Sequence, residues 1–352
     1  MNGSAILGLI WLAAFVVLVG LIMATRRGKR RMGTMTGAVG ATWDLQTDQK
    51  RKALEIIVEN RAEARDPERA EGDLPDLETP EGADDFSRLE YRGWQRVASK
   101  YEQTWSGLTG NFVSPLLDAA GVTRGTRVLD VACGPGYVSE AAAARGAATI
   151  GVDFSPEMIR VAKARRPDLE FRRGDAQSLD FPDASFDAVV MNFGVLHVAS
   201  PGRAFAEAAR VLRAGGRYAF TTWAGPEESP GARILRTAID AHANLDVALP
   251  EGPDHYGQGG TDEWRRTLAD FPFDPASVAV TRVQAEWQVP TASFLFESER
   301  HAGVRTAALL AAQTPQALEA IRTDMEAGVR AFAKDGGYAI PYTAYVVSAS
   351  LR

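Results

Sequence analysis

The sequence predicts a doubly wound α/β domain with a mainly parallel, seven-stranded sheet, preceded by one transmembrane helix and a linker. Two patterns carry this prediction: apolar runs alternate with helical segments from residue 127 onward, and residues 1–24 carry no charged side chain. Strands separated by helices of about 10–15 residues are typical of a parallel sheet covered on both faces. The 352 residues, 45% hydrophobic and 24% charged, suffice for one large globular domain or two ordinary ones.

The N-terminal segment has the pattern of a membrane span. Residues 5–24 (AILGLIWLAAFVVLVGLIMA) are apolar without a break. As a helix they extend roughly 30 Å, the thickness of the hydrocarbon core of a bilayer. Five basic residues follow within residues 25–31, whereas a cleaved signal peptide carries its basic residues before the apolar core. We expect one span within residues 1–25 with the body on the cytoplasmic side, the alternative being a buried core helix.

Residues 26–83 are expected to form a basic juxtamembrane segment and an acidic, flexible linker. Residues 66–85 hold nine acidic residues, one arginine and three prolines, a composition typical of a solvated linker. We expect residues 84–352 to form the globular domain, with a ligand-binding core at about 120–225 and a C-terminal substrate part at 226–352.

Seven segments of this domain are predicted to be strands. The first five are short apolar runs at 127–132, 148–152, 169–172, 186–193 and 217–223. The last two, at 278–289 and about 343–350, are expected to extend the sheet at one edge. Ser155 before Pro156 is typical of a helix start, because a capping side chain is followed by proline in the first turn.

Composition and charge exclude several kinds of site. The one cysteine, Cys133, cannot form an intramolecular disulfide or a cysteine-rich metal site, and the four histidines form no H-x-x-x-H pair. We therefore expect no metal site. The net charge of −6 does not suit nucleic-acid binding, which requires a basic face.

Polar residues follow four of the predicted strands, at the edge where an open α/β sheet binds its ligands. In strand order they are Asp130, Asp153, Asp175 and Asn192. Gly134 and Gly136 follow the first strand, and glycines at this place let the backbone approach a ligand closely. The helix behind them directs its positive end toward the site.

These residues discriminate between two kinds of nucleotide site. A dinucleotide fingerprint requires glycine or alanine at position 139, where this chain has Ser139. A carboxylate at Asp130 would repel a pyrophosphate but suits a ligand amino group, whereas Asp153 suits a ribose diol in either case. A nucleoside that carries an amino acid therefore fits this pattern better than NAD does.

Four segments in order resemble the class I S-adenosylmethionine-dependent methyltransferases, most of all the ubiquinone/menaquinone-biosynthesis type. They are VLDVACGPGYVSEAAA (128–143), IGVDFSPEMI (150–159), RRGDAQSLDFPDASFDAVVMNFGVLHV (172–198) and VLRAGGRYAFTTW (211–223). The resemblance covers about residues 86–225 strongly and 226–352 loosely. It implies a Rossmann-like methyltransferase fold with S-adenosyl-L-methionine as the cofactor. One departure is Ala132, where the glycine-rich motif often has glycine.

The resemblance also implies roles for the residues around the glycine loop. Asp130 and the backbone of Gly134 and Gly136 would hold the methionine part of the cofactor. Asp153 would accept hydrogen bonds from the ribose hydroxyls. The plainer alternative for Asp130 and Asp153 is a structural cap at the end of a strand.

The remaining matches are implied to surround the adenine and the methionine end. Phe154 and Met158 would pack near the adenine, although core packing is the alternative for both. Asp175 would accept from the adenine amino group beside the Ala176 backbone, and Asn192 would border the methionine end and the substrate. The alternative for Asp175 and Asn192 is a turn-forming role.

His197, just past the fourth strand, is the candidate catalytic residue. Methyl transfer is a displacement at a sulfonium, and it needs a general base only where the acceptor keeps its proton. No neighbouring feature of the sequence supplies a carboxylate to orient His197, so we expect it to contribute less than about tenfold to turnover. The alternative is a packing role in its loop. We expect Cys133 to be a small apolar residue and not a reactive thiol.

An aromatic helix precedes the first strand. Trp94, Tyr101 and Trp105 recur at helical spacing, so they either cover the cofactor or pack this helix on the sheet. We include Tyr101 among the candidate cofactor contacts. Further aromatic candidates for the pocket are Trp223, His255, Tyr256 and Trp287.

The expected acceptor is a small molecule. The predicted anchor favours a lipophilic one, such as a quinone precursor, a polyketide or a lipid, methylated at the cytoplasmic face of the membrane. Two alternatives stay open: a membrane-tethered S-adenosylmethionine-binding protein without turnover, and an NAD-dependent oxidoreductase.

Overall fold

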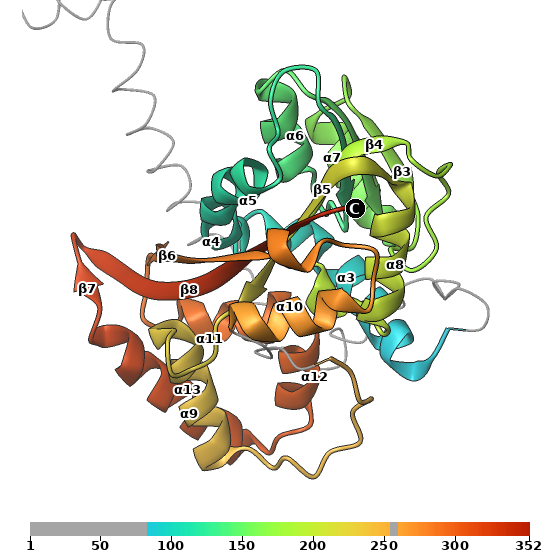
Figure 1. Ribbon diagram of the computed structural model, residues 1–352. Coiled ribbons are helices and arrows are strands. Elements are labelled where there is room, and N and C mark those ends of the chain that lie inside the picture. The colour runs from blue at the N-terminus through green and yellow to red at the C-terminus, as the bar shows by residue number, and fades with distance from the viewer. Residues whose placement is uncertain (1–82, 254–259) are drawn as a thin grey trace, which may run out of the picture. The chain divides into compact units, whose positions relative to one another are not determined.

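The computed structural model describes residues 83–253 and 260–352, which form a mixed sheet with helices on both faces (Figure 1). The strands are β1 Arg127–Val131, β2 Ala148–Asp153, β3 Glu170–Arg173, β4 Phe186–Met191, β5 Leu212–Trp223, β6 Ala279–Val289, β7 Ala333–Lys334 and β8 Gly337–Ser350. The α-helices are α3 Asp85–Tyr101, α4 Ser106–Thr109, α5 Val113–Ala119, α6 Tyr137–Ala144, α7 Pro156–Arg165, α8 Pro201–Val211, α9 Pro230–His242, α10 Thr261–Ala269, α11 Phe294–Ala302, α12 Arg305–Ala311 and α13 Pro315–Arg330. Short 3₁₀ helices lie at Gly110–Phe112, Val195–His197 and Pro275–Ser277.

The strand order places β1 at the centre of the parallel part of the sheet. Neighbouring strands run β3-β2-β1-β4-β5-β8-β6, and the short β7 pairs with β8. β1 to β5 are parallel to one another, whereas β8 is antiparallel to both β5 and β6. Val131 pairs with Val152 and Asp130 with Val190, so β1, β2 and β4 end at the same edge. The strand order reverses at β1, and an open α/β sheet binds ligands at that point.

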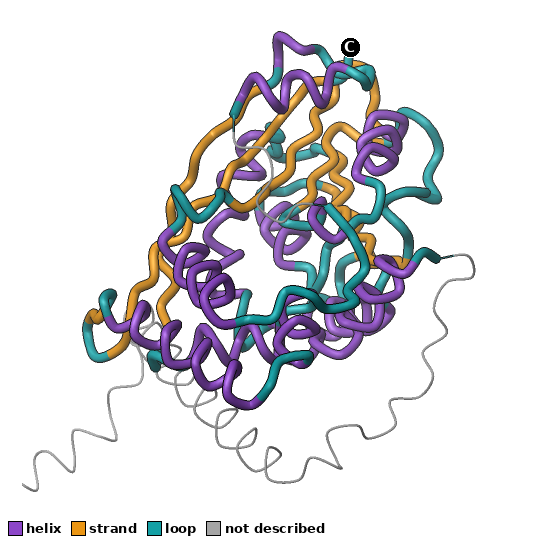
Figure 2. Tube along the Cα trace, turned by 90° about the horizontal axis from the view of Figure 1, so that it is seen from below, coloured by secondary structure: helices purple, strands orange, loops and turns teal. Residues whose placement is uncertain are grey.

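Alternate residues along the strands face opposite helical layers. Leu129 and Val189 belong to a buried cluster that includes residues of α8 and α10. Val128 and Val190, their sequence neighbours, belong to a second cluster that includes residues of α5 and α6. This period of two follows from strand geometry. The sheet is therefore covered on both faces, as Figure 2 shows for the strands and the helices that flank them.

Helix α3 is held against α7 by a polar contact. Ser155 caps α7, and its hydroxyl accepts a hydrogen bond from the backbone N–H of Met158 at 3.2 Å. The side-chain oxygen of Gln95, in the middle of α3, accepts from the Ser155 hydroxyl at 3.2 Å and from the backbone N–H of Glu157 at 3.1 Å. Because α7 starts just beyond β2, this contact places α3 beside the carboxyl end of the sheet.

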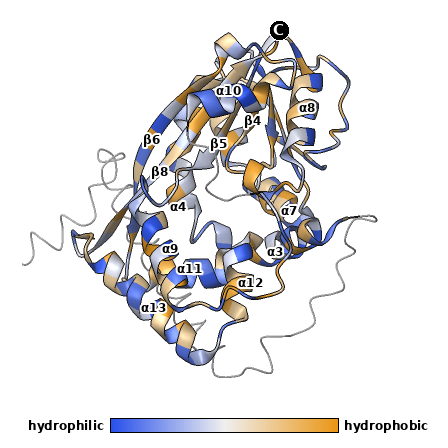
Figure 3. Cartoon of the chain, turned by 60° about the horizontal axis from the view of Figure 1, so that its bottom comes forward, coloured by the Kyte–Doolittle hydropathy of each residue, from blue (hydrophilic) through white to orange (hydrophobic). Residues whose placement is uncertain are grey.

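The C-terminal helices form a group of their own beside β8. α13 packs on α9 and α11, and α9 contacts β8 (Figure 1). The strand β6 lies at the edge of the sheet and appears largely blue in Figure 3, whereas the internal β4 is largely orange. This contrast is expected between a half-exposed strand at the edge of a sheet and a buried strand inside it.

The seven predicted strands are present as β1 to β6 and β8, and the described residues form the expected doubly wound α/β fold with a mixed sheet. β8 begins at Gly337 and not near residue 343, because its antiparallel pairing with β6 continues as far as Val289 opposite Tyr338. β7 was not predicted, since it is a two-residue strand. The predicted span at 5–24 and the linker at 26–83 lie outside the described residues. In the described ranges, no helix has both the length and the apolar composition needed to cross a bilayer.

Candidate active site

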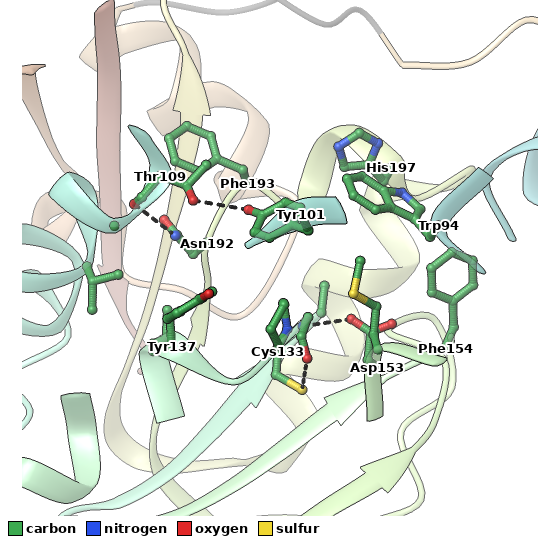
Figure 4. A pocket seen from close by; sticks show the side chains of 18 residues that line it. Trp94, Tyr101, Thr109, Cys133, Tyr137, Asp153, Phe154, Asn192, Phe193 and His197 are labelled. Atoms are coloured by element: carbon green, nitrogen blue, oxygen red, sulfur yellow. Dashed lines mark hydrogen bonds between the residues drawn. The ribbon is translucent and has the colours of Figure 1, made fainter. Parts of the chain in front are cut away.

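A pocket lies at the carboxyl ends of β1, β2 and β4, bounded on its other side by the segment from α3 to α5 (Figure 4). In Figure 4, Trp94, His197 and Phe154 lie at one end, Asn192 and Thr109 at the other, and Tyr101 between them. The predicted site residues that line it are Tyr101, Gly134, Asp153, Phe154, Met158, Asn192 and His197.

The two glycines of the loop after β1 have different roles. Both have left-handed backbone, with φ of +51° at Gly134 and +84° at Gly136. A Cβ at Gly136 would lie 2.7 Å from the Phe171 ring, whereas a Cβ at Gly134 would meet nothing within 4 Å. Gly136 is therefore required by packing beneath the loop and is not among the pocket-lining residues, and its ligand contact stays a prediction. Gly134 leaves open backbone at the pocket wall.

Asp153 is fixed at the pocket wall by two backbone groups. Its side-chain oxygens accept hydrogen bonds from the N–H groups of Gly134 and Ser155, both at 2.9 Å. Burial raises the pKa of Asp153 to about 6, and the two backbone donors oppose that rise. Each carboxylate oxygen has a second lone pair, so Asp153 can accept two further hydrogen bonds. This capacity suits the adjacent hydroxyls of a ribose.

Asp130 is not among the residues that line the pocket, and its contact with the ligand stays a prediction. The side chain is fully buried, and its Oδ2 accepts from the backbone N–H of Ser139 at 2.9 Å and from the Ser139 hydroxyl at 2.6 Å. Desolvation raises the pKa of Asp130 to about 7. The carboxylate therefore holds the first turn of α6 beneath the glycine loop.

Asp175 and Ala176 also lie outside the pocket lining. Asp175 is exposed, and its Oδ1 accepts from the backbone N–H of Gln177 at 2.8 Å, which turns the carboxylate toward its own loop. Ala176 packs against the core cluster of α8 and α10. The turn-forming alternative describes Asp175 in this structure, and neither residue joins the others at the pocket.

Phe154 and Met158 line the pocket next to Asp153. The Phe154 ring meets Tyr91 of α3 edge to face, with ring centroids 5.8 Å apart. Met158 is buried and packs with Val97 and Ala98 of the same helix. Both side chains therefore combine a pocket position with core packing, and they give this end of the pocket an apolar wall suited to a flat ring.

Asn192 ends β4 in a hydrogen-bonded chain that crosses the pocket wall. The Thr221 hydroxyl donates to its side-chain oxygen at 2.8 Å and accepts from the backbone N–H of Phe193 at 2.7 Å. Phe193 has φ of +57°, a left-handed conformation unusual for a bulky residue. These contacts hold the Phe193 ring in the pocket wall, where it stacks on Trp223 with centroids 3.9 Å apart.

His197 has a carboxylate partner that the sequence did not indicate. Its Nδ1 lies 2.9 Å from Oε2 of Glu90 in α3, 107 positions earlier in the chain. Glu90 is fully buried, and its Oε2 also accepts from Nε1 of Trp94 at 2.9 Å. The Trp94 ring packs edge-on against the His197 ring, with centroids 4.8 Å apart. The carboxylate beside His197 thus comes from a residue distant in the sequence and not from a neighbouring one.

The aromatic residues of the α3 region divide between two sites. Trp94 and Tyr101 line the pocket, and Tyr101 contacts the Thr109 hydroxyl at 3.1 Å. Burial raises the pKa of Tyr101 to about 12. Trp105 packs away from the pocket: its Nε1 donates to the Ala302 carbonyl at 3.1 Å, and its ring stacks on Trp287 at 4.9 Å. His255 and Tyr256 lie outside the described residues.

Cys133 lines the pocket but is buried, and desolvation raises its thiol pKa well above the usual value. This environment favours the inert thiol. Sequence reasoning did not single out Glu90, Thr109, Tyr137 or Phe193. Glu90 alone carried a usable signal, since it is an acidic residue four positions before Trp94 on the predicted helix.

Comparisons with known proteins agree with this geometry. Residues 129–220 match the methyltransferase domain family. The chain is 40% identical over 162 residues to a demethylmenaquinone methyltransferase of Renibacterium salmoninarum, covering 44% of this chain and 68% of the relative. It is 35% identical over 173 residues to a protein of the same name from Beutenbergia cavernae, covering 49% of this chain and 70% of the relative.

Among solved structures, one similar chain is a phosphoethanolamine N-methyltransferase 2 from Haemonchus contortus, in complex with phosphomonomethylethanolamine and S-adenosylhomocysteine. It is 18% identical, with a TM-score of 0.47, and covers 76% of this chain and 60% of its own length. The two demethylmenaquinone methyltransferases and the match to the methyltransferase domain together show the family of this chain. The chain belongs to the S-adenosylmethionine-dependent methyltransferases of class I, as an enzyme whose cofactor is S-adenosylmethionine.

Proposed function

We propose that this methyltransferase acts on a small lipophilic acceptor of the reduced quinone type, at the cytoplasmic face of a membrane. The observation that carries the proposal is the identity with two demethylmenaquinone methyltransferases over more than two thirds of their length. The pocket supports it, because aromatic side chains of Trp94, Tyr101 and Phe193 line the space beside the strand ends. Such walls suit a flat, apolar ring.

The pocket residues fit the cofactor. Asp153 offers two acceptor positions at the pocket wall, and Gly134 leaves room where a side chain would protrude. We assign the ribose hydroxyls to Asp153, the adenine to the wall of Phe154 and Met158, and the methionine end to Gly134 and Asn192. When bound, S-adenosylmethionine supplies a methyl group on a positively charged sulfur, already activated for displacement.

The membrane part of the proposal depends on the sequence of residues 5–24 and the basic residues after it. A span there would hold the domain near a bilayer in which a prenylated quinol resides. The linker at 26–83 would then let the pocket reach the bilayer surface.

The test is turnover by the full-length chain in lipid nanodiscs with methyl-labelled S-adenosylmethionine. A demethylmenaquinol with a short prenyl tail should gain one labelled methyl group, and the oxidised quinone should gain none, because it offers no hydroxyl proton to remove and is a poorer carbon nucleophile. Asp153→Ala should abolish most of the product. If S-adenosylhomocysteine binds but no quinol is methylated, the acceptor class is wrong while the family assignment stands.

A further inference from the structure

The strongest unassigned feature of the pocket is the pair formed by Glu90 and His197. We propose that Glu90 positions His197 as the general base that removes a hydroxyl proton from the acceptor. The inference rests on the proposed function for the identity of the acceptor. It assigns a role to a helix, α3, that lies before the matched methyltransferase domain at residues 129–220.

The hydrogen bonds around Glu90 define which nitrogen of His197 carries a proton. Oε2 of Glu90 already accepts from the indole N–H of Trp94 at 2.9 Å, so it acts as an acceptor toward Nδ1 of His197, also at 2.9 Å. A carboxylate oxygen accepts, and Nδ1 then carries the hydrogen. In the neutral imidazole the proton-accepting nitrogen is therefore Nε2, on a ring that lines the pocket.

Burial of the Glu90 carboxylate costs free energy of folding, and its hydrogen bonds to the described residues offset only part of that cost. The side chain is fully buried, and its Oε1 has no hydrogen-bond partner among the described residues. A buried carboxylate with one unsatisfied oxygen destabilises a fold. Positions that break a folding rule in this way concentrate at functional sites. A base at the pocket wall that is oriented by a buried carboxylate is also the arrangement that activates catalytic groups in other enzymes.

The surroundings of His197 fix its ring at the pocket wall. The Glu90 carboxylate reaches Nδ1 from α3 at 2.9 Å, and the Trp94 ring packs edge-on against the imidazole with centroids 4.8 Å apart. The charge of His197 also acts on the Asp153 carboxylate, where it opposes the rise in pKa caused by burial. His197 is therefore held in one orientation in a pocket that also holds the ribose-binding candidate Asp153.

The proton balance of the reaction is complete with these groups. The acceptor hydroxyl gives its proton to Nε2 of His197, which leaves an electron-rich quinol anion. A carbon–carbon bond forms between its ring carbon and the methyl group as the carbon–sulfur bond breaks, and the sulfur keeps that electron pair as a thioether. The ring carbon then loses its hydrogen as a proton to water, which restores aromaticity and leaves the product as a phenolate. His197 returns its proton to that phenolate oxygen, so each turnover releases one proton to the solvent.

This reverses the small contribution expected for His197 from the sequence. With an orienting carboxylate, a general base contributes about 10²–10⁴-fold. We expect His197→Ala to lower kcat at least hundredfold with demethylmenaquinol, with little change in S-adenosylhomocysteine affinity. A loss below tenfold in this variant would overturn the proposal.

Glu90 is tested by two variants in the full-length chain in nanodiscs. Glu90→Leu removes the acceptor and should lower kcat about hundredfold with KM changed less than threefold. Glu90→Gln keeps an acceptor oxygen but loses the charge, so it should retain part of the activity and shift the acid limb of the pH–rate profile to lower pH. The matched control is Glu299→Leu, another buried glutamate, which lies outside the pocket and should keep kcat within about twofold.

A second readout does not depend on the acceptor. Nitrogen-15 NMR of histidine-labelled protein with S-adenosylhomocysteine, assigned by His197→Gln, should show the Nδ1–H form in the wild type and lose it in Glu90→Leu. An Nε2–H form in the wild type, or an unchanged signal in Glu90→Leu, would overturn the positioning role. A loss of kcat in Glu299→Leu as large as that in Glu90→Leu would also overturn the positioning role. Absence of quinol turnover in the wild type would refute the proposed acceptor, while the NMR result still decides the pairing.

Discussion

Asp130 and Ser139 form a buried pair in which one carboxylate oxygen accepts both the backbone N–H and the hydroxyl of the serine, at 2.9 and 2.6 Å. The pair joins the end of β1 to the first turn of α6 across the glycine loop. Position 139 is where a dinucleotide fingerprint would have glycine or alanine. The serine that departs from this fingerprint therefore satisfies one oxygen, Oδ2, of the carboxylate that also departs from it, whereas Oδ1 has no hydrogen-bond partner among the described residues.

Replacement of Ser139 by alanine should destabilise the fold. The Asp130 carboxylate would lose its shorter hydrogen bond while staying buried, which costs about 1–3 kcal/mol of unfolding free energy. Urea unfolding of a fragment that begins near residue 84 measures this at pH 8. Ser185→Ala is the control, because that hydroxyl bonds the Pro182 carbonyl at an exposed site and should cost under about 0.5 kcal/mol. Equal losses in the two variants would contradict the prediction.

Stability of the ligand-free domain should fall as pH rises from 5 to 8. Burial raises the pKa of Asp130 to about 7, of Asp153 to about 6 and of Glu299 to about 7, all above their unfolded values. In this range the folded state holds protons that the unfolded state has released, so the unfolding free energy decreases with pH, by at most about 1.4 kcal/mol per pH unit for each group. Urea midpoints across the range test this. Asp130→Asn should flatten the curve, and a curve that rises with pH would refute the assignment.

Alanine at Gly136 should mainly destabilise the fold, whereas alanine at Gly134 should mainly weaken cofactor binding. Gly136→Ala would place a methyl group 2.7 Å from the Phe171 ring in a left-handed conformation, so we expect a loss of about 2–4 kcal/mol. Gly134→Ala meets no neighbour within 4 Å and should cost only about 1 kcal/mol of backbone strain. Its main effect should be weaker cofactor binding, because the methyl group enters the pocket. Thermal unfolding and calorimetry with S-adenosylhomocysteine separate the two outcomes.

Asp153→Ala should weaken S-adenosylhomocysteine binding by roughly 1–3 kcal/mol, because ribose hydroxyls would lose a charged acceptor. The wild-type affinity should decrease below about pH 6, where Asp153 takes up a proton and loses that charge. Calorimetry at pH 5 and pH 8 measures both effects. A folded Asp153→Ala protein with wild-type affinity would remove Asp153 from the binding site.

The full-length chain should stay with membranes after a carbonate wash, whereas a fragment that begins near residue 84 should be released. The reason is the uninterrupted apolar run at 5–24. Protease added outside intact cells should leave the domain uncut, because basic residues that follow a span favour the cytoplasmic side. Digestion of the domain from outside would show the opposite orientation.

Structural features that depend only on residues close together in the chain could be predicted from the sequence. Alternating apolar runs located the strands, and Ser155 with Pro156 located the start of α7, because strand period and helix capping are local. The strand-end rule brought Asp153 and Asn192 to one edge. Which strand-end side chains reach the pocket was not predictable, since Asp130 is covered by α6 and Asp175 bonds its own loop.

The pairing of Glu90 with His197 was beyond the sequence for a different reason. The two residues meet because α3 packs against the start of α7, where Gln95 bonds Ser155 and Glu157. No local pattern encodes the angle at which that helix crosses the sheet. The left-handed backbone of Phe193 is likewise set by Thr221 on a neighbouring strand, and not by its own residue type.

The place of β8 between β5 and β6 has a consequence for how the protein is made. β6 pairs only with β8 within the described sheet, in register from Ala279 opposite Ser348 to Val289 opposite Tyr338. β6 is therefore synthesised before its partner, and the outer edge of β5, which precedes β6 in the chain, waits even longer for β8. Unpaired edges of this kind attract other chains. The strands that form the cofactor crevice, β1, β2 and β4, are complete much earlier, so the nascent chain can acquire its ligand site while the far edge of its sheet still needs protection.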